Sequence, residues 1–340
     1  TNTLANTFTA TSTLSSANFT AGVSTTIRIK STQYNYVYDE VEVMVGSGES
    51  IINFFVADTG NNRIMKRTIS DLSYVSKIGS SGSGDDQFSS PTKIALDQDN
   101  IFVMDMANYR VVKRLKNDTI DFVSKVGSFG TNANQFSNMT DIVVDDQYFY
   151  VLDAQRIRKF DKETMSQVSV TANIYGSSGS LCADETYLYL LDSGSGSLLK
   201  RVLKSNLSFV DSINIGSLGT ATDEGYSITC DNTYIYIALD TTTNIHKILK
   251  LLKSNLSFVS ENLYNNGLLT SQMGTLKQIA CDETYIFIGN NVYSDGWQIF
   301  INKYLKTNMS YVSRVGGVAG NGNDQFSTGV GFAVEPNIFD

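Results

Sequence analysis

An aspartate followed, after a short turn, by an arginine recurs along the chain. A carboxylate beside a guanidinium can serve acid–base chemistry, or it can accept backbone N–H groups at a turn and hold two strands together. The copies read VADTGNNRI, VMDMANYRV and VLDAQRIRKF, and they contain the pairs Asp58 and Arg63, Asp105 and Arg110, and Asp153 and Arg156. A catalytic pair is expected once in a protein, not in every repeat. We therefore interpret these pairs as structural turn clamps.

Few other residues have the types and spacing that catalysis or metal binding requires. The chain has one histidine, His246, whereas a zinc site commonly uses several histidine or cysteine ligands. Cys182, Cys230 and Cys281 each precede an acidic turn in successive repeats and have apolar neighbours, which is typical of buried, inert thiols. The sequence therefore predicts no catalytic, cofactor-binding or metal-binding residues, and we expect the protein not to be an enzyme.

Six Asn-x-Ser/Thr sequons are candidate glycosylation sites. They are Asn18, Asn117, Asn138, Asn206, Asn255 and Asn308. The last three share one position in the repeat, at a turn where exposure is expected. Their modification would depend on the host and on secretion.

The composition limits the classes of partner. The formal charge of −8 makes the chain unlike a protein that collects nucleic acid phosphates or binds an anionic membrane surface. No apolar run approaches the roughly 18 residues that span a bilayer. The sequence begins at Thr1 without a methionine, which fits a chain matured by removal of a targeting segment, so we expect secretion and an extracellular or cell-surface location.

The elements that carry the clamps are short strands. The clamp aspartates and their counterparts recur at intervals of about 40–50 residues, which is typical of blades or a solenoid. Each repeat has four runs of about 5–8 residues with alternating polarity, separated by Gly, Asn, Asp or Ser. The positions that mark the repeats are Asp58, Asp105, Asp153, Asp192, Asp240 and Asn290. Four antiparallel strands repeated six times predict a β-propeller.

The second repeat shows a more specific likeness. Residues 79–115, GSSGSGDDQFSSPTKIALDQDNIFVMDMANYRVVKRL, resemble a repeat of the NHL family of six-bladed β-propellers, with the spaced glycines, Gln-Phe, Pro, Asp, Asn and Arg. The resemblance covers about residues 51–340 and weakens in the fourth and fifth repeats. It implies an all-β fold, a propeller of six four-stranded antiparallel blades, which we expect over residues 47–340. Residues 1–46 are expected to form a β-strand extension before it.

The C-terminal run QFSTGVGFAVEPNIFD aligns with QFSSPTKIALDQDNIF and then stops. Residues 331–335 can therefore supply the missing first strand of the first blade, which would close the ring and remove an exposed sheet edge. The run VEVMV at 41–45 competes for the same place. We favour the C-terminal strand because Gln325 and Phe326 precede it.

The Ser/Thr-rich N-terminal extension needs a host. In TFTATSTL, polar and less polar residues alternate as in a strand, and the run YNYVYDEVEVMV continues the pattern. So few large apolar side chains cannot form a core, and an isolated hairpin is marginal. The host is the chain's own propeller or a neighbouring subunit. For the second case we expect an assembly arm anchored by Phe8, Leu14 and Phe19.

Two functions follow from these features. The first is a non-enzymatic, extracellular structural subunit that self-assembles through its N-terminal strand into a filament or surface layer, with copies of itself as partners. The alternative is a receptor- or glycan-binding propeller of a virus or cell surface, whose partner is a surface glycan or protein. Exposed aromatic residues clustered on one propeller face would favour the alternative.

Overall fold

The computed structural model describes residues 24–30, 37–44, 53–176, 179–193, 197–218, 224–240, 246–264, 276–293, 297–327 and 330–334. The chain divides into two compact units, Thr1–Ile52 and Asn53–Asp340. The first unit contains a hairpin of β1 (Ser24–Lys30) and β2 (Val37–Met44). The proposed anchors Phe8, Leu14 and Phe19, the expected strand over residues 7–14 and the sequon at Asn18 lie outside the described residues.

The hairpin is antiparallel, with Ile27 opposite Val41 and Arg28 opposite Glu40. Most of the run VEVMV therefore belongs to β2 and pairs with β1, not with the propeller. Among the described residues of this unit the sheet has two strands.

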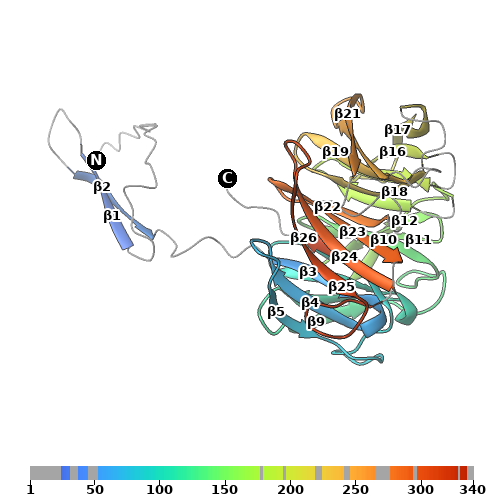
Figure 1. The fold of residues 1–340 in the computed structure, drawn as a ribbon, viewed down its shortest axis with the longest axis horizontal. Helices are drawn as coiled ribbons and strands as arrows, with labels where there is room; N and C mark the ends of the chain where they lie inside the picture. The colour runs from blue at the N-terminus through green and yellow to red at the C-terminus, as the bar shows by residue number, and fades with distance from the viewer. Residues whose placement is uncertain are drawn as a thin grey trace, which may run out of the picture. The chain divides into compact units, whose positions relative to one another are not determined.

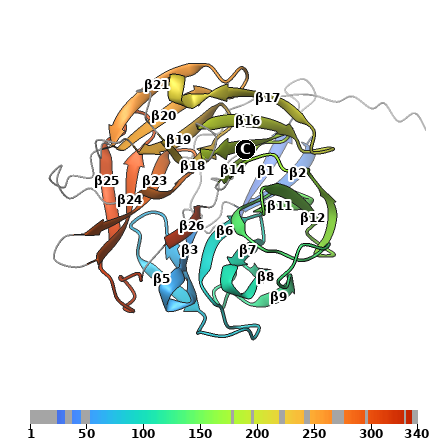
Figure 2. The same ribbon diagram turned by 90° about the vertical axis from the view of Figure 1, so that its right-hand side faces the viewer.

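The second unit is a six-bladed β-propeller of four-stranded antiparallel blades (Figures 1 and 2). Blade 1 contains β26 (Val330–Val334), β3 (Asn53–Asp58), β4 (Arg63–Thr68) and β5 (Tyr74–Ile78). Blade 2 contains β6 (Pro91–Leu96), β7 (Asn100–Asp105), β8 (Arg110–Leu115) and β9 (Phe122–Val126). Blade 3 contains β10 (Met139–Val144), β11 (Tyr148–Asp153), β12 (Arg156–Asp161) and β13 (Ser166–Val170).

The remaining blades have the same order. Blade 4 contains β14 (Gly179–Ala183), β15 (Tyr187–Asp192), β16 (Leu198–Leu203) and β17 (Phe209–Asn214). Blade 5 contains β18 (Glu224–Cys230), β19 (Tyr234–Asp240), β20 (His246–Leu252) and β21 (Phe258–Tyr264). Blade 6 contains β22 (Leu276–Cys281), β23 (Tyr285–Tyr293), β24 (Trp297–Leu305) and β25 (Tyr311–Val318).

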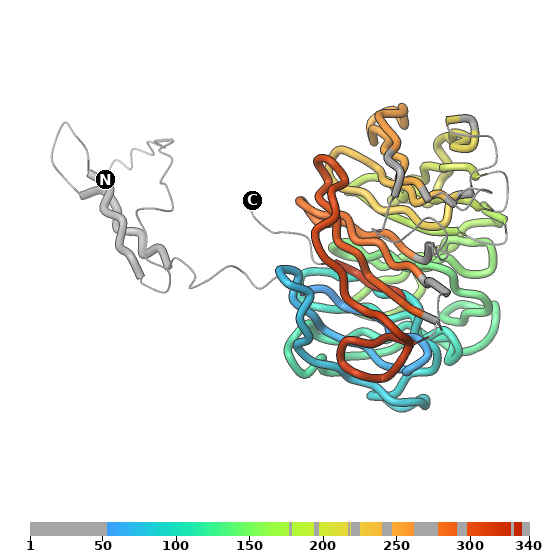
Figure 3. The backbone as a smooth tube through the Cα atoms, in the orientation of Figure 1, coloured from blue at the N-terminus to red at the C-terminus, as the bar shows by residue number. Residues whose placement is uncertain are grey.

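The C-terminal strand completes blade 1. β26 pairs with β3 in a ladder that runs from Val330 opposite Asp58 to Val334 opposite Phe54. Figure 3 traces the backbone of the ring. On its other side, the Gln278 side chain of blade 6 donates to the carbonyl of Phe332 and accepts from its N–H group. The strand is thus bonded to both the first and the last blade, and both ends of the propeller are held in one ring.

The hydrophobic core lies between successive blades. The second strand of most blades is almost entirely buried, as in β7, β11 and β15, because the sheet is covered on both sides by its neighbours. One cluster joins Phe55 and Ile64 of blade 1 to Ile94 and Val103 of blade 2, and similar clusters follow around the ring. The outer strands β5, β9 and β13 alternate between half-buried and exposed residues.

Antiparallel order gives the ring two unlike faces. The loops between blades and the turns from second to third strands lie on one face, which we call the loop face. The turns from first to second and from third to fourth strands lie on the other, which we call the turn face. The predicted turn clamps are on the loop face.

Candidate functional site

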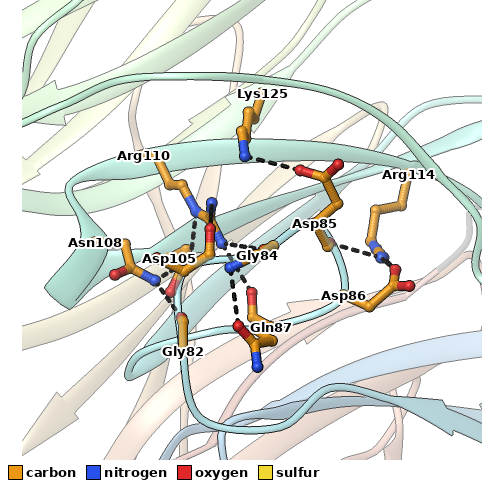
Figure 4. A network of polar contacts seen from close by, with 11 residues as sticks. Gly82, Gly84, Asp85, Asp86, Gln87, Asp105, Asn108, Arg110, Arg114 and Lys125 are labelled. Carbon is orange, nitrogen blue, oxygen red and sulfur yellow. Dashed lines mark hydrogen bonds and ion pairs between the residues drawn. The ribbon is translucent and has the colours of Figure 1, made fainter.

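The clamp of blade 2 shows what the Asp–turn–Arg unit does (Figure 4). Asp105 is fully buried, and its Oδ2 accepts from Nε of Arg110 at 2.7 Å and from Nδ2 of Asn108 at 2.8 Å. Its Oδ1 accepts from the backbone N–H of Ser89 at 2.6 Å. The carboxylate therefore ties the end of β7 to β8 and to the loop that enters the blade.

Arg110 in turn holds the glycine-rich loop before the blade. Its Nη1 donates to the carbonyl of Ser83 at 2.6 Å, and its Nη2 donates to those of Gly84 and Gln87 at 2.9 and 2.8 Å (Figure 4). The Gln87 side chain accepts from Gly84 N at 3.1 Å. Gly84 and Gln87, two of the residues that mark the repeat in the sequence, are thus held directly by this guanidinium.

A second arginine in the same strand completes the network. Arg114 forms an ion pair with Asp86 and donates to the carbonyl of Asp85 at 2.9 Å (Figure 4). Its guanidinium also lies 5.6 Å from the ring centre of Phe88. Lys125 pairs with Asp85 at 2.8 Å. Most polar groups of this loop are therefore bonded within the fold.

Blade 1 repeats the clamp with residues from the two ends of the propeller. Asp58 accepts from Nε of Arg63 at 2.7 Å and from the N–H group of Ser327 at 2.7 Å. Arg63 also donates to the carbonyls of Asn321 and Gly322 at 2.7 and 2.8 Å. The clamp of blade 1 thus contributes to ring closure.

The third clamp differs from the sequence-based prediction. The partner of Asp153 is Arg158, whose Nε donates at 2.8 Å, and not Arg156, which donates to Asn173 at 3.2 Å. The turn here has only two residues, Ala154 and Gln155, both with positive φ. In blades 1 and 2 the fifth residue after the aspartate is the first residue of the third strand. In blade 3 the shorter turn makes it the third residue of β12, on the same face as Arg156.

Blades 4 and 6 have a corresponding hydrogen bond at the clamp position, with other residues as donors. Asp192 accepts from Nζ of Lys200 at 2.7 Å, and Asn290 accepts from Nδ2 of Asn302 at 2.7 Å. Asn290 thus occupies the aspartate place, as the repeat predicts. The side chains at this place are buried and bonded within their own blade, as in the clamps of blades 1–3.

The turn face of blades 3–6 carries a depression of about 1060 Å³. Its wall includes aspartates that begin the first-to-second-strand turns of blades 3–6 and lysines that directly follow the third strands of blades 4 and 5. We call the aspartates at this place in blades 2–6 the turn aspartates: Asp97, Asp145, Asp184, Asp231 and Asp282. We call the lysines at this place in blades 3–6 the bridging lysines: Lys162, Lys204, Lys253 and Lys306.

Each bridging lysine links two neighbouring blades. Lys204 of blade 4 bonds the Asp145 carboxylate of blade 3 at 2.8 Å and the backbone carbonyl of Asp184, in its own blade, at 2.8 Å. Lys253 bonds Asp184 at 3.2 Å and the carbonyl of Asp231 at 2.9 Å in the same manner. Sequence reasoning missed this set, although the recurring Lys-Ser-Asn of 204–206 and 253–255 was a signal for it.

Hydrogen bonds and burial shift the pKa values of the turn aspartates. Burial acts to raise the pKa of the Asp145 carboxyl, but hydrogen bonds from Lys204 and from the N–H groups of Tyr148 and Gln147 hold it below its ordinary value. The same balance lowers the pKa of Asp184 and Asp231. Asp282 is different, because burial outweighs its backbone hydrogen bonds and raises its pKa. Hydrogen bonds therefore favour the charged form of Asp145, Asp184 and Asp231, whereas burial disfavours the charged form of Asp282.

A cavity of about 300 Å³ runs along the ring axis between the first strands of the blades. Cys182, Cys230 and Cys281 line it and are free thiols. Burial raises the pKa of Cys281 to about 12, and Cys230 donates to the carbonyl of Ala183 at 3.3 Å. Within the described ranges, no three His, Cys, Asp or Glu side chains group as metal ligands would.

The described sequons lie on the surface. Asn206, Asn255 and Asn308 are exposed at matching turns, where each side-chain oxygen accepts from the N–H group two residues later. Asn117 and Asn138 are also exposed. Glycosylation itself stays a prediction.

Comparisons with known proteins identify the fold and not the activity. No model of a known protein family matches the sequence. No curated protein matches it either. The crystal structure of a functionally unknown protein from Desulfotomaculum acetoxidans DSM 771 is similar with a TM-score of 0.55 and 13% identity, over 84% of this chain and 99% of that one. BamB from Moraxella catarrhalis aligns with a TM-score of 0.40 and 12% identity, over 84% of this chain and 81% of that one.

In the described part of the chain, no helix has the length and apolar character required to cross a membrane.

Proposed function

We propose that the protein is a non-enzymatic, extracellular structural subunit that self-assembles through its N-terminal unit into a filament or surface layer. One observation carries the proposal: the chain holds a two-stranded hairpin in a unit of its own, while the propeller is closed by its own C-terminal strand. A hairpin of two strands is marginal in water and gains stability by pairing with further strands. Strand addition from another copy supplies them.

The edges of the propeller are less suited to receive such a strand. In all six blades, the ladder between the third and the outer strand has a register shift beside the start of the outer strand. Irregular edges of this kind discourage further pairing. We therefore place the assembly contact at the N-terminal units of neighbouring copies, with Phe8, Leu14 and Phe19 as its proposed apolar anchors. A head-to-tail contact of this type extends into a filament unless the rotation closes a ring.

No catalysis is part of the proposal. The ionisable groups of the clamps and of the bridging lysines are bonded to one another, as Arg110 is to Asp105 on the loop face and Lys204 is to Asp145 on the turn face. We also propose that blades 1–3 are NHL-type repeats. Blades 1 and 2 share the clamp, the glycine-rich loop and the buried Gln-Phe phenylalanines Phe326 and Phe88, and blade 3 keeps the clamp aspartate and Phe136.

Truncation tests the proposal. The full chain and a variant that starts at residue 53 are compared by negative-stain electron microscopy after purification under identical conditions. We expect assemblies from the full chain and single propellers from the truncated chain, with the same β-rich circular dichroism per residue of the ring. Assemblies of equal form from the truncated chain would show that the propeller carries the contact.

The depression on the turn face favours a second function, a receptor- or glycan-binding module. Its wall includes Tyr187, which is half-buried and has the Arg201 guanidinium 5.3 Å from its ring centre. Aromatic and guanidinium faces of this kind can stack on sugars or on protein side chains. A glycan array read with wild type and Tyr187→Ala tests this function, which requires binding that the variant loses.

A further inference from the structure

The position of the bridging lysines recurs in all six blades, and one blade has no lysine there. The first residue after the third strand is a lysine in blades 2–6, but in blade 1 it is Ile69. Ile69 is buried. The turn aspartate that a blade 1 lysine would meet is Asp282, at the end of the first strand of blade 6.

The backbone at Ile69 is placed as it is at the lysines. Lys303 of blade 6 donates to the carbonyl of Ile69 at 2.6 Å. Lys113 of blade 2 donates in the same manner to the carbonyl of Lys162 at 3.0 Å, and Lys159 of blade 3 to that of Lys204 at 2.9 Å. The backbone carbonyl at the junction of blades 6 and 1 is therefore bonded as it is at these other junctions, although Ile69 stands in place of the lysine.

Because blade 1 has no lysine at this position, one oxygen of a buried carboxylate in blade 6 has no hydrogen-bond partner. Asp282 is 3% exposed, and its Oδ1 accepts from the N–H groups of Thr284 and Tyr285 at 2.7 and 2.6 Å. Its Oδ2 is buried and has no hydrogen-bond partner. At Asp231, by contrast, Oδ2 accepts from Lys306 at 2.5 Å and from the Tyr236 hydroxyl at 3.0 Å.

The tyrosine is missing as well as the lysine. The second-strand residue that matches Tyr150, Tyr189 and Tyr236 is Phe287 in blade 6, which has no hydroxyl to donate. An unpaired buried acceptor lowers the stability of the fold, and it does so more when it is charged. Asp282 also belongs to the wall of the depression on the turn face.

We propose that the junction of blades 6 and 1 is a binding site for a primary ammonium group, which takes the place that Nζ of a bridging lysine has at the other junctions. An ammonium group is a compact charge with three donors, so it can satisfy Oδ2 of Asp282. The ligand class is a primary alkylamine, either a free amine or the lysine side chain of a partner protein.

The neighbouring cations do not forbid this ligand. Lys306 donates to the carbonyl of Asp282 at 2.8 Å, and Lys303 lies on the same blade. The occupied site at Asp231 has the same surroundings: Lys253 donates to the carbonyl of Asp231 at 2.9 Å, and Lys250 lies 5.6 Å from the Tyr236 ring centre. There, a third ammonium group, that of Lys306, is nevertheless bound.

The test uses the full chain and its melting temperature at pH 7. n-Butylammonium chloride is titrated against tetramethylammonium chloride, which has the same charge but no N–H donor, at constant ionic strength. We expect a saturable rise with n-butylammonium and none with tetramethylammonium. Equal responses to the two salts would overturn the proposal.

Two substitutions locate the site. Asp282→Asn should remove the response to n-butylammonium. Ile69→Lys should raise the melting temperature without ligand and also remove the response, whereas Ile69→Met, of similar length and without charge, should keep it. If Ile69→Lys responds as wild type does, or Asp282→Asn keeps the full response, the ammonium group does not bind here.

A lysine-containing tripeptide, Gly-Lys-Gly with blocked ends, separates the two sources. Saturation at a concentration at least tenfold below that of n-butylammonium supports the site with a partner's lysine as ligand. Saturation at a similar or higher concentration supports the site with a free amine as ligand. No saturation by either compound contradicts the site.

Discussion

Arg158 donates from Nε to Oδ2 of Asp153 at 2.8 Å, although Arg156 is the residue that faces Asp153 in the ladder between β11 and β12. The Arg158 side chain is 2% exposed and that of Asp153 is fully buried. Arg156 is only half-buried, and its partner is Asn173. Two arginines on one strand thus have different roles, and one is the natural control for the other.

Replacing Arg158 by alanine should lower the free energy of unfolding by about 3–5 kcal/mol, because it leaves the buried Asp153 charge without its counter-ion. Replacing Arg156 by alanine should change it by no more than about 0.5 kcal/mol, as is usual for surface positions. Urea unfolding followed by circular dichroism measures both. Equal losses in the two variants would mean that the clamp is not local to Arg158.

The close approach of β26 to blade 2 gives a second prediction. A Cβ atom at Gly331 would lie 1.7 Å from the carbonyl oxygen of Thr92, whereas one at Gly317 would meet nothing within 4 Å. Gly331→Ala should therefore lower the free energy of unfolding by about 1–3 kcal/mol or more through overpacking. Gly317→Ala should be close to neutral. A stable Gly331→Ala variant would show that the C-terminal strand does not close the ring in this register.

Two of the turn aspartates, Asp231 and Asp282, should change the free energy of unfolding with pH in opposite directions. Burial is outweighed by the bonds from Lys306, Tyr234 N and Thr233 N, so the pKa of Asp231 in the folded protein lies below its unfolded value of about 3.9. Its stabilisation is therefore complete above that unfolded value and is lost as pH falls through the folded pKa. Asp231→Asn should lower the free energy of unfolding at pH 7, with a smaller effect near pH 3.

Asp282 should behave in the reverse sense. Its pKa in the folded protein is raised by burial, so its charge costs stability above the folded pKa and costs nothing below the unfolded value of about 3.9. Asp282→Asn should raise the free energy of unfolding at pH 7 and leave it unchanged near pH 3. Unfolding curves at both pH values measure the difference, and a destabilised variant at pH 7 would disprove the unpaired charge.

The repeated elements of the fold were accessible from sequence. Alternating apolar strands and the recurrence of Asp58, Asp105 and Asp153 predict blades, because a carboxylate at the same turn in each repeat has a local backbone role. The alignment of Gln325 and Phe326 with an internal repeat predicts closure by the C-terminus, and β26 occupies that place. Both signals are local along the chain.

The choice between Arg156 and Arg158 was not accessible in this manner. It depends on the length of the turn after Asp153, which decides where the fifth residue lies on the next strand. The bridging lysines were not predicted from sequence for another reason. Lys204 pairs with Asp145 of the preceding blade, so neither residue identifies its partner within one repeat. Ile69 becomes meaningful only when the junctions are compared in space.

Sedimentation velocity of the full chain tests most directly the claim that the N-terminal unit drives assembly. Phe8→Asp with Leu14→Asp places charges on the proposed apolar side of the arm, where desolvation is costly. Thr9→Asp with Thr13→Asp adds the same charge on the other side. We predict that wild type and the threonine variant sediment as assemblies and that the Phe8 and Leu14 variant sediments as single propellers. Assemblies of the same size in all three proteins, or single molecules in wild type, would contradict the account.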